Sequence, residues 1–445
     1  MPVSFVASFA LRLTKRTARA AAVGLGALTV FAVPAAAHGF KTLHVFCENP
    51  LCPDGATPSA LTADAAGNLF GTTRNAGPRG GGTVFELRRR AGGGYKFETL
   101  YSFCSQENCT DGELPMGRPV IDVSGNLYGT ALAGGQSGYN GDVWQLKRKR
   151  GAWTLKVLHD FCVDDCTDGA EPMAGLSYAA AATGALYDGK SPLYGVAPFG
   201  GNGSSQGTVF QLTPGKHGWN FQVLYSFCPN GNCAGGAVPS GPLLPDASDN
   251  LYGLTYGGGS NSKGAVYEVS PAGDGWTETP LYSFCQQDNC ADGEQPYGSL
   301  ALDSSGTLFG TASAGGGTCS KNNVGCGALF SLAPNGGQWQ QTMLHTFCTQ
   351  ADCADGATPM DAPTVTANGD LVGTAQFGGD ASSNGVVWRL SGGVFETLHK
   401  FCRRTDCPDG AQPAATLIPD GSGHLIGTTS LGGPNFGGAI YEIAP

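Results

Sequence analysis

Sixteen cysteines are the residues whose type and spacing could most readily do chemistry in this chain of 445 residues. They stand in eight close couples: Cys47 and Cys52, Cys104 and Cys109, Cys162 and Cys166, Cys228 and Cys233, Cys285 and Cys290, Cys319 and Cys326, Cys348 and Cys353, Cys402 and Cys407. Two converging couples can hold a structural zinc ion, but these couples are spread along the whole chain. Close couples with none left over are typical of disulfides in an oxidising compartment. We therefore predict eight local disulfides and no metal or redox site among the cysteines.

An aspartate followed by a glycine stands two residues after the second cysteine in six of the recurring loops: Asp54, Asp111, Asp168, Asp292, Asp355 and Asp409. In the fourth loop Gly235 stands in place of the aspartate. Carboxylates can bind calcium, but the ion requires six to eight oxygen ligands and each loop offers one such side chain. Aspartate before glycine is also typical of a tight turn. We predict turn residues and keep calcium binding as the alternative.

Four histidines share one position of a repeat with three tyrosines: His44, Tyr101, His159, Tyr225, Tyr282, His345 and His399. A catalytic residue would occur once, whereas this position accepts either planar side chain that can form hydrogen bonds. We therefore predict a structural role there and no catalytic residue. His217 and His424 lie in predicted turns, where no carboxylate or nucleophile partner is evident.

These residues recur because the chain repeats itself. The segment LYSFCSQENCTDGELP at 100–115 returns almost unchanged as LYSFCQQDNCADGEQP at 281–296. The seven repeats begin near Cys47, Cys104, Cys162, Cys228, Cys285, Cys348 and Cys402. A period near 58 residues is long for a solenoid and is close to the length of a propeller blade.

Each repeat contains four predicted strands. In the first repeat, a short apolar run at 61–64 is followed by NLFGTT at 68–73 and TVFEL at 83–87, and a fourth strand leads into the next cysteine loop. The third strand has apolar residues facing both ways, as expected when both faces of its sheet are covered. We predict an all-β fold, a seven-bladed β-propeller with four-stranded antiparallel blades.

The two ends of the chain predict how the ring closes. The last repeat stops after its third strand at 439–443, and an unpaired fourth strand stands at 40–46. The N-terminal strand should therefore complete the seventh blade and remove an exposed sheet edge.

The first 37 residues resemble a signal peptide. Four basic residues precede the apolar run at 20–37, which ends in small residues, so cleavage is expected between Ala37 and His38. Residues 38–445 then form one domain, and no other apolar run is long enough to span a membrane. We expect an exported protein, periplasmic or extracellular. Its net charge of −10 argues against binding to nucleic acid.

The combination of LYSF, a DG-x-x-P turn, NLYGTA and a glycine loop before VF-x-L resembles the bacterial choice-of-anchor tandem-repeat GloVer-containing proteins. The resemblance covers residues 40–445. It implies an exported, propeller-like protein without assigned activity, so it brings no catalytic residue and no cofactor. The cysteine couples depart from the family pattern.

The residues that repeat least are the candidates for recognition. The third repeat carries an insertion at 179–192, and the fifth lengthens its glycine loop at 315–327. The glycine loops and the cysteine loops should share one face of the ring, which we predict to bind a protein or carbohydrate ligand. The basic runs at 88–90 and 147–150 are expected to be solvated hairpin tips. Four tryptophans that open fourth strands should cap blade edges, with sugar stacking as the alternative: Trp153, Trp219, Trp276 and Trp339.

We predict a binding or scaffolding function rather than catalysis. A monomer is expected by default. The alternative is a lyase or hydrolase with its site at the central channel. An enzyme should carry acidic or histidine residues unique to one blade on the inner strands, whereas most polar residues recur in every repeat.

Overall fold

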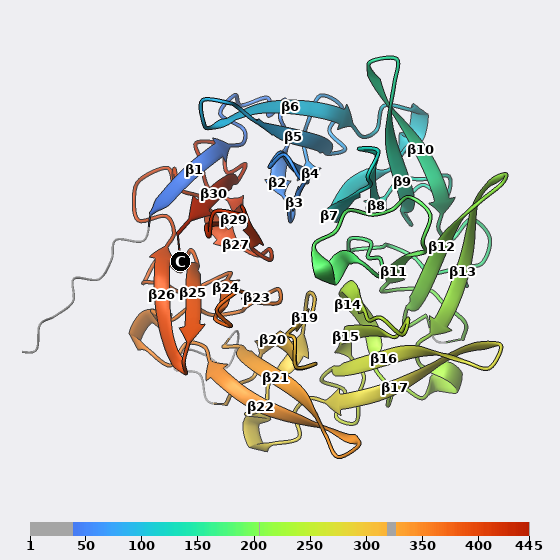
Figure 1. Cartoon of the computed structure of the whole chain (residues 1–445), viewed down its shortest axis with the longest axis vertical. Coiled ribbons are helices and arrows are strands. Elements are labelled where there is room, and N and C mark those ends of the chain that lie inside the picture. The colour runs from blue at the N-terminus through green and yellow to red at the C-terminus, as the bar shows by residue number, and fades with distance from the viewer. Residues whose placement is uncertain (1–38, 204, 318–325, 445) are drawn as a thin grey trace, which may run out of the picture. The chain divides into compact units, whose positions relative to one another are not determined.

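The computed structural model describes residues 39–203, 205–317 and 326–444. In this part of the chain, seven antiparallel sheets stand as the blades of a β-propeller (Figure 1). It contains no α-helix, only five single 3₁₀ turns: η1 (Glu107–Cys109), η2 (Ala181–Thr183), η3 (Pro229–Gly231), η4 (Asp288–Cys290) and η5 (Ala351–Cys353). The predicted signal peptide with its cleavage site, and Cys319, lie outside the described residues.

The blades follow one another along the chain, each from its inner to its outer strand. Blade 1 contains β2 (Ala56–Pro58), β3 (Thr62–Ala63), β4 (Leu69–Asn75), β5 (Thr83–Arg89) and β6 (Tyr95–Ser102). Blade 2 contains β7 (Glu113–Ile121), β8 (Leu127–Ala133), β9 (Asp142–Lys149) and β10 (Ala152–Asp160). Blade 3 contains β11 (Leu193–Ala197), β12 (Thr208–Gly215) and β13 (Gly218–Ser226).

The remaining blades follow the same plan. Blade 4 contains β14 (Ala237–Pro245), β15 (Leu251–Gly257), β16 (Ala265–Ala272) and β17 (Gly275–Ser283). Blade 5 contains β18 (Glu294–Pro296), β19 (Ala301–Leu302), β20 (Leu308–Ala314), β21 (Ala328–Asn335) and β22 (Gln338–Thr346). Blade 6 contains β23 (Thr364–Val365), β24 (Leu371–Ala375), β25 (Val386–Ser391) and β26 (Val394–Lys400). Blade 7 contains β27 (Ala411–Pro413), β28 (Ile418–Pro419), β29 (Leu425–Leu431), β30 (Ala439–Ile443) and β1 (Phe40–Val45).

A glycine opposite an aromatic ring explains the repeated second and third strands. Gly71 on β4 pairs with Phe85 on β5, and a Cβ at Gly71 would overlap that ring. The same pairing recurs in the other blades: Gly129 with Trp144, Gly195 with Phe210, Gly253 with Tyr267, Gly310 with Phe330, Gly373 with Trp388 and Gly427 with Tyr441. All seven aromatic side chains are completely buried. The third strands can therefore be apolar on both sides because their rings pack inside the stack of blades.

The phenylalanine that follows each fourth strand supplies the packing between blades. Phe46, for example, lies 5.3 Å from the ring of Phe85 in the next blade. Its counterparts are all at most 1% exposed: Phe103, Phe161, Phe227, Phe284, Phe347 and Phe401. Burying a side chain of this size typically stabilises a fold by about 1.5–3 kcal/mol.

The N-terminal strand closes the ring as predicted. β1 pairs antiparallel with β30, from Phe40 opposite Ile443 to Val45 opposite Ala439. The seventh blade is therefore built from both ends of the propeller (Figure 1).

Blade 3 departs from the four-stranded plan. Its inner strand is reduced to two isolated antiparallel bridges, Ala170 with Phe199 and Ser177 with Tyr194. The chain leaves the sheet after Ser177 to form the insertion, in which the amide of Tyr187 donates to the carbonyl of Ile121 in blade 2. The insertion thus forms backbone hydrogen bonds with blade 2 in place of the sheet hydrogen bonds that a full inner strand would form within blade 3. Its green ribbon turns toward the middle of the ring (Figure 1).

Candidate binding surface

The cysteine loops and glycine loops meet at one end of the ring. Seven cysteine couples are disulfide-bonded in the described residues, and Cys326 is the partner of a residue outside them. In every repeat, the carbonyl of the second cysteine accepts a hydrogen bond from a glycine-loop amide, as Cys52 does from Gly77 at 3.0 Å. These loops together form what we term the cysteine-loop face. Disulfides of this number indicate an oxidising compartment.

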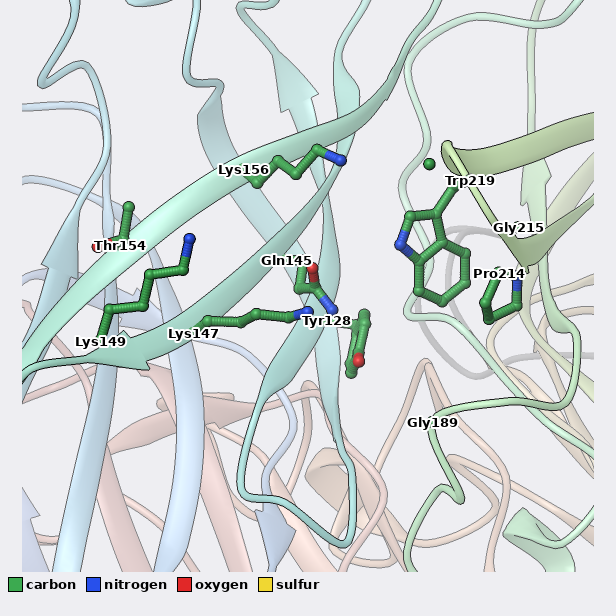
Figure 2. Close-up of a pocket in the computed structure, with 11 residues that line it drawn as sticks. Tyr128, Gln145, Lys147, Lys149, Thr154, Lys156, Gly189, Pro214, Gly215 and Trp219 are labelled. Atoms are coloured by element: carbon green, nitrogen blue, oxygen red, sulfur yellow. The ribbon is translucent and has the colours of Figure 1, made fainter.

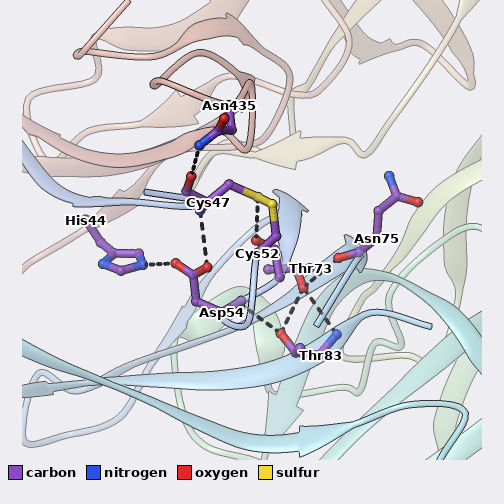
Figure 3. Close-up of polar contacts among 9 residues, drawn as sticks. His44, Cys47, Cys52, Asp54, Thr73, Asn75, Thr83 and Asn435 are labelled. Atoms are coloured by element: carbon purple, nitrogen blue, oxygen red, sulfur yellow. Dashed lines mark hydrogen bonds and ion pairs between the residues drawn. A yellow bond between two sulfur atoms is a disulfide. The ribbon is translucent and has the colours of Figure 1, made fainter. Parts of the chain in front are cut away.

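Asp54 shows what the aspartate of each loop does. Its Oδ1 accepts a hydrogen bond from the amide of Cys47 at 3.2 Å, and its Oδ2 lies 3.0 Å from His44 Nε2 (Figure 3). The carbonyl of Cys47 accepts a further hydrogen bond from Asn435 Nδ2 in blade 7, at 2.7 Å. The carboxylate therefore ties the outer strand of one blade to the loop that leads into the next.

Five other loops repeat this contact between the loop aspartate and a histidine or tyrosine of the preceding outer strand, which we term the clamp. The partners are Tyr101 and Asp111 at 2.6 Å, His159 and Asp168 at 2.8 Å, Tyr282 and Asp292 at 2.7 Å, His345 and Asp355 at 3.3 Å, and His399 and Asp409 at 2.9 Å. Burial opposes ionisation of Asp355, but hydrogen bonds from His345 and Thr349 lower its pKa below the usual value. In each clamp the chain's own donors engage the carboxylate oxygens, as a structural role requires.

The calcium alternative concerned these six aspartates. They lie in six different loops, which lead into the six blades other than blade 4. In the described ranges, the groups of histidine, cysteine, aspartate and glutamate close enough to share an ion include none of them. The group without disulfide cysteines is Asp420, His424 and Glu442, which is partly exposed at the surface of blade 7.

The choice between histidine and tyrosine follows the next blade. Each histidine stacks on a phenylalanine there: His44 on Phe97, His159 on Phe221, His345 on Phe395 and His399 on Phe40, with ring centroids 3.6–4.3 Å apart. Where the repeat has tyrosine, the next blade carries Leu155, Glu278 or Gln341 at that position. The choice between histidine and tyrosine therefore correlates with the side chain at the facing position of the next blade.

The loop that leads into blade 4 lacks the aspartate and takes its carboxylate from the outer strand of that blade. Glu278 on β17 reaches Gly235, where a Cβ would overlap its carboxylate. The hydroxyl of Tyr225 donates to Glu278 Oε2 at 3.4 Å. Burial raises the pKa of Glu278 to about 7, against the opposing effect of the Tyr225 hydrogen bond. Sequence reasoning missed this residue, although Gly235 and Glu278 each break the repeat pattern.

A cavity of about 300 Å³ lies where the inner strands begin, at the cysteine-loop end of the channel. In every repeat but the fourth, the residue after the loop proline contributes to its wall, and in four blades that residue is large: Met116, Met173, Tyr297 and Met360. The neck below them is narrow because neighbouring inner strands touch through glycines. A Cβ at Gly241, which has a φ of +73°, would overlap the carbonyl oxygen of Gly298. The wall of the cavity thus differs in side-chain size from blade to blade.

Three charged residues unique to single blades lie in this cavity: Arg74, Arg118 and Asp361. Asp361 Oδ1 accepts hydrogen bonds from the Ser299 amide at 2.9 Å and the Ser299 hydroxyl at 2.6 Å, and Oδ2 accepts one from the Thr416 amide at 3.0 Å. It therefore joins blades 5, 6 and 7. Burial raises the pKa of Tyr297, Asp361 adds to that effect, and Arg74 opposes it.

The insertion of blade 3 covers the other end of the channel. Its residues 184–186 line a second cavity with Asp64 of blade 1 and Asp420 of blade 7. Its helical turn η2 also contacts β14 of blade 4. The insertion therefore touches blades on opposite sides of the axis, at the end of the channel away from the cysteine-loop face.

The remaining sequence-predicted residues lie elsewhere. The four tryptophans are partly buried against the hydrophobic clusters between blades. His217 is exposed in a hairpin. The prediction that His424 has no carboxylate partner is wrong, since its Nδ1 lies 2.6 Å from Glu442 Oε1. His424 directly precedes β29, and Glu442 lies on β30, 18 residues later, so the pairing of these two strands brings them together.

Comparisons with known proteins identify the repeat. The sequence profile of the Gloeobacter/Verrucomicrobia repeat matches residues 17–189 and 177–365, most of the chain. None of the curated proteins matches the sequence. Among the described residues, no helix has the length and apolar character needed to cross a membrane.

Solved structures that are similar to this chain match it at low identity. A candidate 6-phosphogluconolactonase from Bacteroides uniformis is 13% identical, with a TM-score of 0.48 over 81% of this chain and 88% of that chain. A candidate oxidoreductase (glucose dehydrogenase) from Thermus thermophilus is 15% identical, with a TM-score of 0.43 over 91% and 99%. The N-terminal domain of Nup159 is 12% identical, with a TM-score of 0.45 over 92% and 95%. Because all three scores lie below 0.5, these likenesses carry no argument about function.

Proposed function

The chain belongs to the Gloeobacter/Verrucomicrobia repeat family, and we propose that it is an exported binding module whose ligand enters the central cavity from the cysteine-loop face. The observation that carries the proposal is the cavity at the cysteine-loop end of the channel, whose wall is formed by residues that differ between blades. Cavities of a few hundred Å³ with a few convergent polar groups are typical binding sites.

The cysteine-loop face suits recognition because its loops are held rigidly. The first loop, for example, is closed by a disulfide, tied by a carboxylate and bonded to a glycine loop. Rigid loops lose less conformational entropy on binding than flexible ones. This supports a module that presents a preformed surface.

The wall of the cavity favours a peptide segment as the ligand. Methionine side chains such as Met116 and Met173 adapt to differing apolar groups and are common at protein-recognition surfaces. Arg74 and Arg118 lie in the same cavity and can hold a carboxylate of an acidic side chain or a chain terminus. We infer that an apolar segment with an acidic group fits best.

The alternative of a lyase or hydrolase at the central channel finds less support in the wall. Asp361 is the one acidic residue that lines the described cavity, and its oxygens are engaged by Ser299, Ala362 and Thr416. No histidine belongs to that described lining. A general base needs a free lone pair within reach of its substrate.

The test is selection of a phage-displayed peptide library on the purified protein, with a glycan array in parallel. Met116→Trp combined with Met173→Trp fills the cavity, and Val394→Trp on the exposed outer strand β26 is the matched control. Selected peptides should bind the filled variant at least tenfold more weakly and the control as tightly as the parent.

Thermal unfolding of all three proteins verifies that they are folded. Peptides that bind the filled variant and the parent alike would contradict the proposal. So would a protein that selects no peptide and binds neutral glycans, because the ligand class would then be wrong.

A further inference from the structure

A groove between blades 2 and 3 is separate from the cysteine-loop face. It has a volume of about 370 Å³ and lies beside the hairpins that join third and fourth strands. Blade 2 contributes Lys147 and Lys149 from β9 and Lys156 from β10, and blade 3 contributes Trp219 from β13 (Figure 2). The insertion reaches it through Gly189. Hairpins lie at the end of the ring opposite the cysteine loops, so this groove is independent of the proposed function.

The sheet register gathers the lysines on one side of the hairpin. Lys147 and Lys149 are two residues apart on β9, and Lys156 pairs with Gln145, which precedes Lys147 by two. Alternate residues of a strand face the same way, so these side chains share a face. Arg148 faces the other way, and Arg150 lies in the turn that follows β9. The basic run 147–150, expected as a solvated hairpin tip, is therefore divided in two.

These lysines have no acidic partner in the described residues. The ion pairs found there involve other cations. Two carboxylates beside the groove lining are already engaged: Asp122 accepts from the Tyr128 hydroxyl at 2.9 Å, and Asp188 accepts from the Lys190 amide at 2.8 Å. Like charges on adjacent strands are destabilising when nothing neutralises them.

Blade 1 shows the same positions in a neutralised form. Its Arg88 lies 2.7 Å from Glu86 and 3.6 Å from Glu98. Blade 2 carries Gln145 and Lys156 at the places of Glu86 and Glu98. The repeat therefore permits an internal ion pair at this position, and blade 2 replaces both acids with side chains that leave the lysine charge available.

The opposite wall is aromatic. Trp219 stands across the groove from the lysines, and its ring meets Tyr128 edge to face with centroids 5.7 Å apart (Figure 2). Lys156 extends toward the indole, while Lys147 extends toward Tyr128 (Figure 2). Trp219 remains partly exposed. An indole held in this way offers an apolar surface to a sugar ring, while ammonium groups bind anionic oxygens.

We propose that the groove between blades 2 and 3 binds an anionic saccharide, with Trp219 against a sugar ring and Lys147, Lys149 and Lys156 around its carboxylate or sulfate groups. A pocket of this size takes about one or two sugar rings. A nucleic acid would require a longer basic path and would meet the net negative charge of the protein.

The experiment is calorimetric titration of the purified protein with four probes. These are an oligogalacturonate, a sulfated heparin-derived oligosaccharide, neutral maltohexaose and a short oligothymidylate. Lys147→Gln with Lys156→Gln is the test variant. Arg148→Gln with Arg150→Gln is the matched control, since it removes the same charge from the same hairpin at residues that do not line the groove.

At least one acidic saccharide should bind the parent protein. Its affinity for the lysine variant should be at least tenfold weaker, whereas its affinity for the arginine control should differ from that of the parent by less than twofold. Maltohexaose should bind much more weakly than the acidic probes. The two acidic probes distinguish carboxylate from sulfate as the preferred group. Both variants change hairpin positions outside the core, and their thermal midpoints should match that of the parent.

Three results would overturn the proposal. The first is no binding of either acidic saccharide. The second is an equal loss in both variants, which would mean general charge attraction. The third is oligothymidylate binding as tight as the saccharides and lost in the lysine variant, which would indicate a site for nucleic acid.

Discussion

Six of the seven cysteine loops carry their own aspartate, whereas the loop that leads into blade 4 uses a glutamate from the outer strand of that blade. Asp292, in the loop that leads into blade 5, is completely buried and accepts hydrogen bonds from Tyr282, Gln286 and Gln287. Glu278 fills the equivalent space at Gly235 with a hydrogen bond from Tyr225, and its Oε1 is buried without a partner in the described residues.

A cysteine loop therefore requires a carboxylate at a fixed position in space, and a residue of the loop or of the neighbouring strand can supply it. A short side chain from within the loop reaches the loop amides, whereas the long one from the neighbouring strand reaches the tyrosine. The carboxylate of Glu278 consequently accepts fewer hydrogen bonds than that of Asp292. This is why burial raises the pKa of Glu278 to about 7.

The largest expected effect removes an aspartate from a complete clamp. Asp292→Ala leaves the half-buried hydroxyl of Tyr282 and two loop amides without their acceptor, so it should lower the free energy of unfolding by about 2–4 kcal/mol. Urea unfolding followed by tryptophan fluorescence measures it. Asp274→Ala, in an exposed hairpin, is the control. Equal urea midpoints for the two variants would show that the clamp contributes nothing.

The next effect rebuilds the loop before blade 4 on the plan of the others. Gly235→Asp places a second carboxylate against Glu278 and should cost about 2 kcal/mol. Adding Glu278→Leu reproduces the arrangement of Tyr101, Asp111 and Leu155 and should recover most of that loss. A double-mutant cycle should therefore give a coupling above about 1 kcal/mol. Strictly additive values would sink the idea that one carboxylate substitutes for the other.

A smaller effect is a pH dependence of stability that arises from Glu278 at the loop before blade 4. Because the pKa of Glu278 is raised in the folded protein, folding is favoured when this group is protonated, and stability falls as pH rises from about 4.5 to about 7. After allowance for its partial exposure, we expect a loss of about 1 kcal/mol. Thermal midpoints of the parent and Glu278→Gln at pH 5 and pH 8 isolate this contribution. A difference between the two proteins that stays constant with pH would contradict it.

The smallest effect concerns the match between histidine and phenylalanine. His159 stacks on Phe221 at 3.6 Å, so His159→Tyr should cost about 0.5–1 kcal/mol. In a Phe221→Leu background the same change should cost less, because tyrosine beside leucine is the arrangement of Tyr101 and Leu155. Urea unfolding of the four proteins gives the comparison. An equal cost in both backgrounds would mean that the pairing is accidental.

The fold is well predicted from the sequence because the same pattern of strands and loops occurs in seven repeats. The period, the cysteine loops and the unpaired strand at 40–46 give the blades, their number and the closure of the ring. The sequence also shows that histidine and tyrosine share one repeat position, and in the structure these side chains lie against a carboxylate.

The candidate site was less predictable because its residues meet across blades. Asp361 acts on Ser299 and Thr416, which are 62 and 55 residues away in sequence. Lys147 and Arg148 are neighbours in a basic run that was expected to form a hairpin tip, and they face opposite ways because β9 extends to Lys149. Gly235 and Glu278 could have been found, since each breaks a repeat position on the two sides of one joint.

The closure of the ring also orders its assembly in time. Asn435 Nδ2 bonds to the carbonyl of Cys47 across 388 residues of chain, and β1 has no sheet partner until β30 has been synthesised. Contacts of such high sequence separation slow folding, and an unpaired strand is open to mispairing while it waits. The cysteine couples, five residues apart in most loops, are contacts that each repeat can make alone. The chain can thus close its cysteine loops one by one as it enters an oxidising compartment, while the ring itself is completed last.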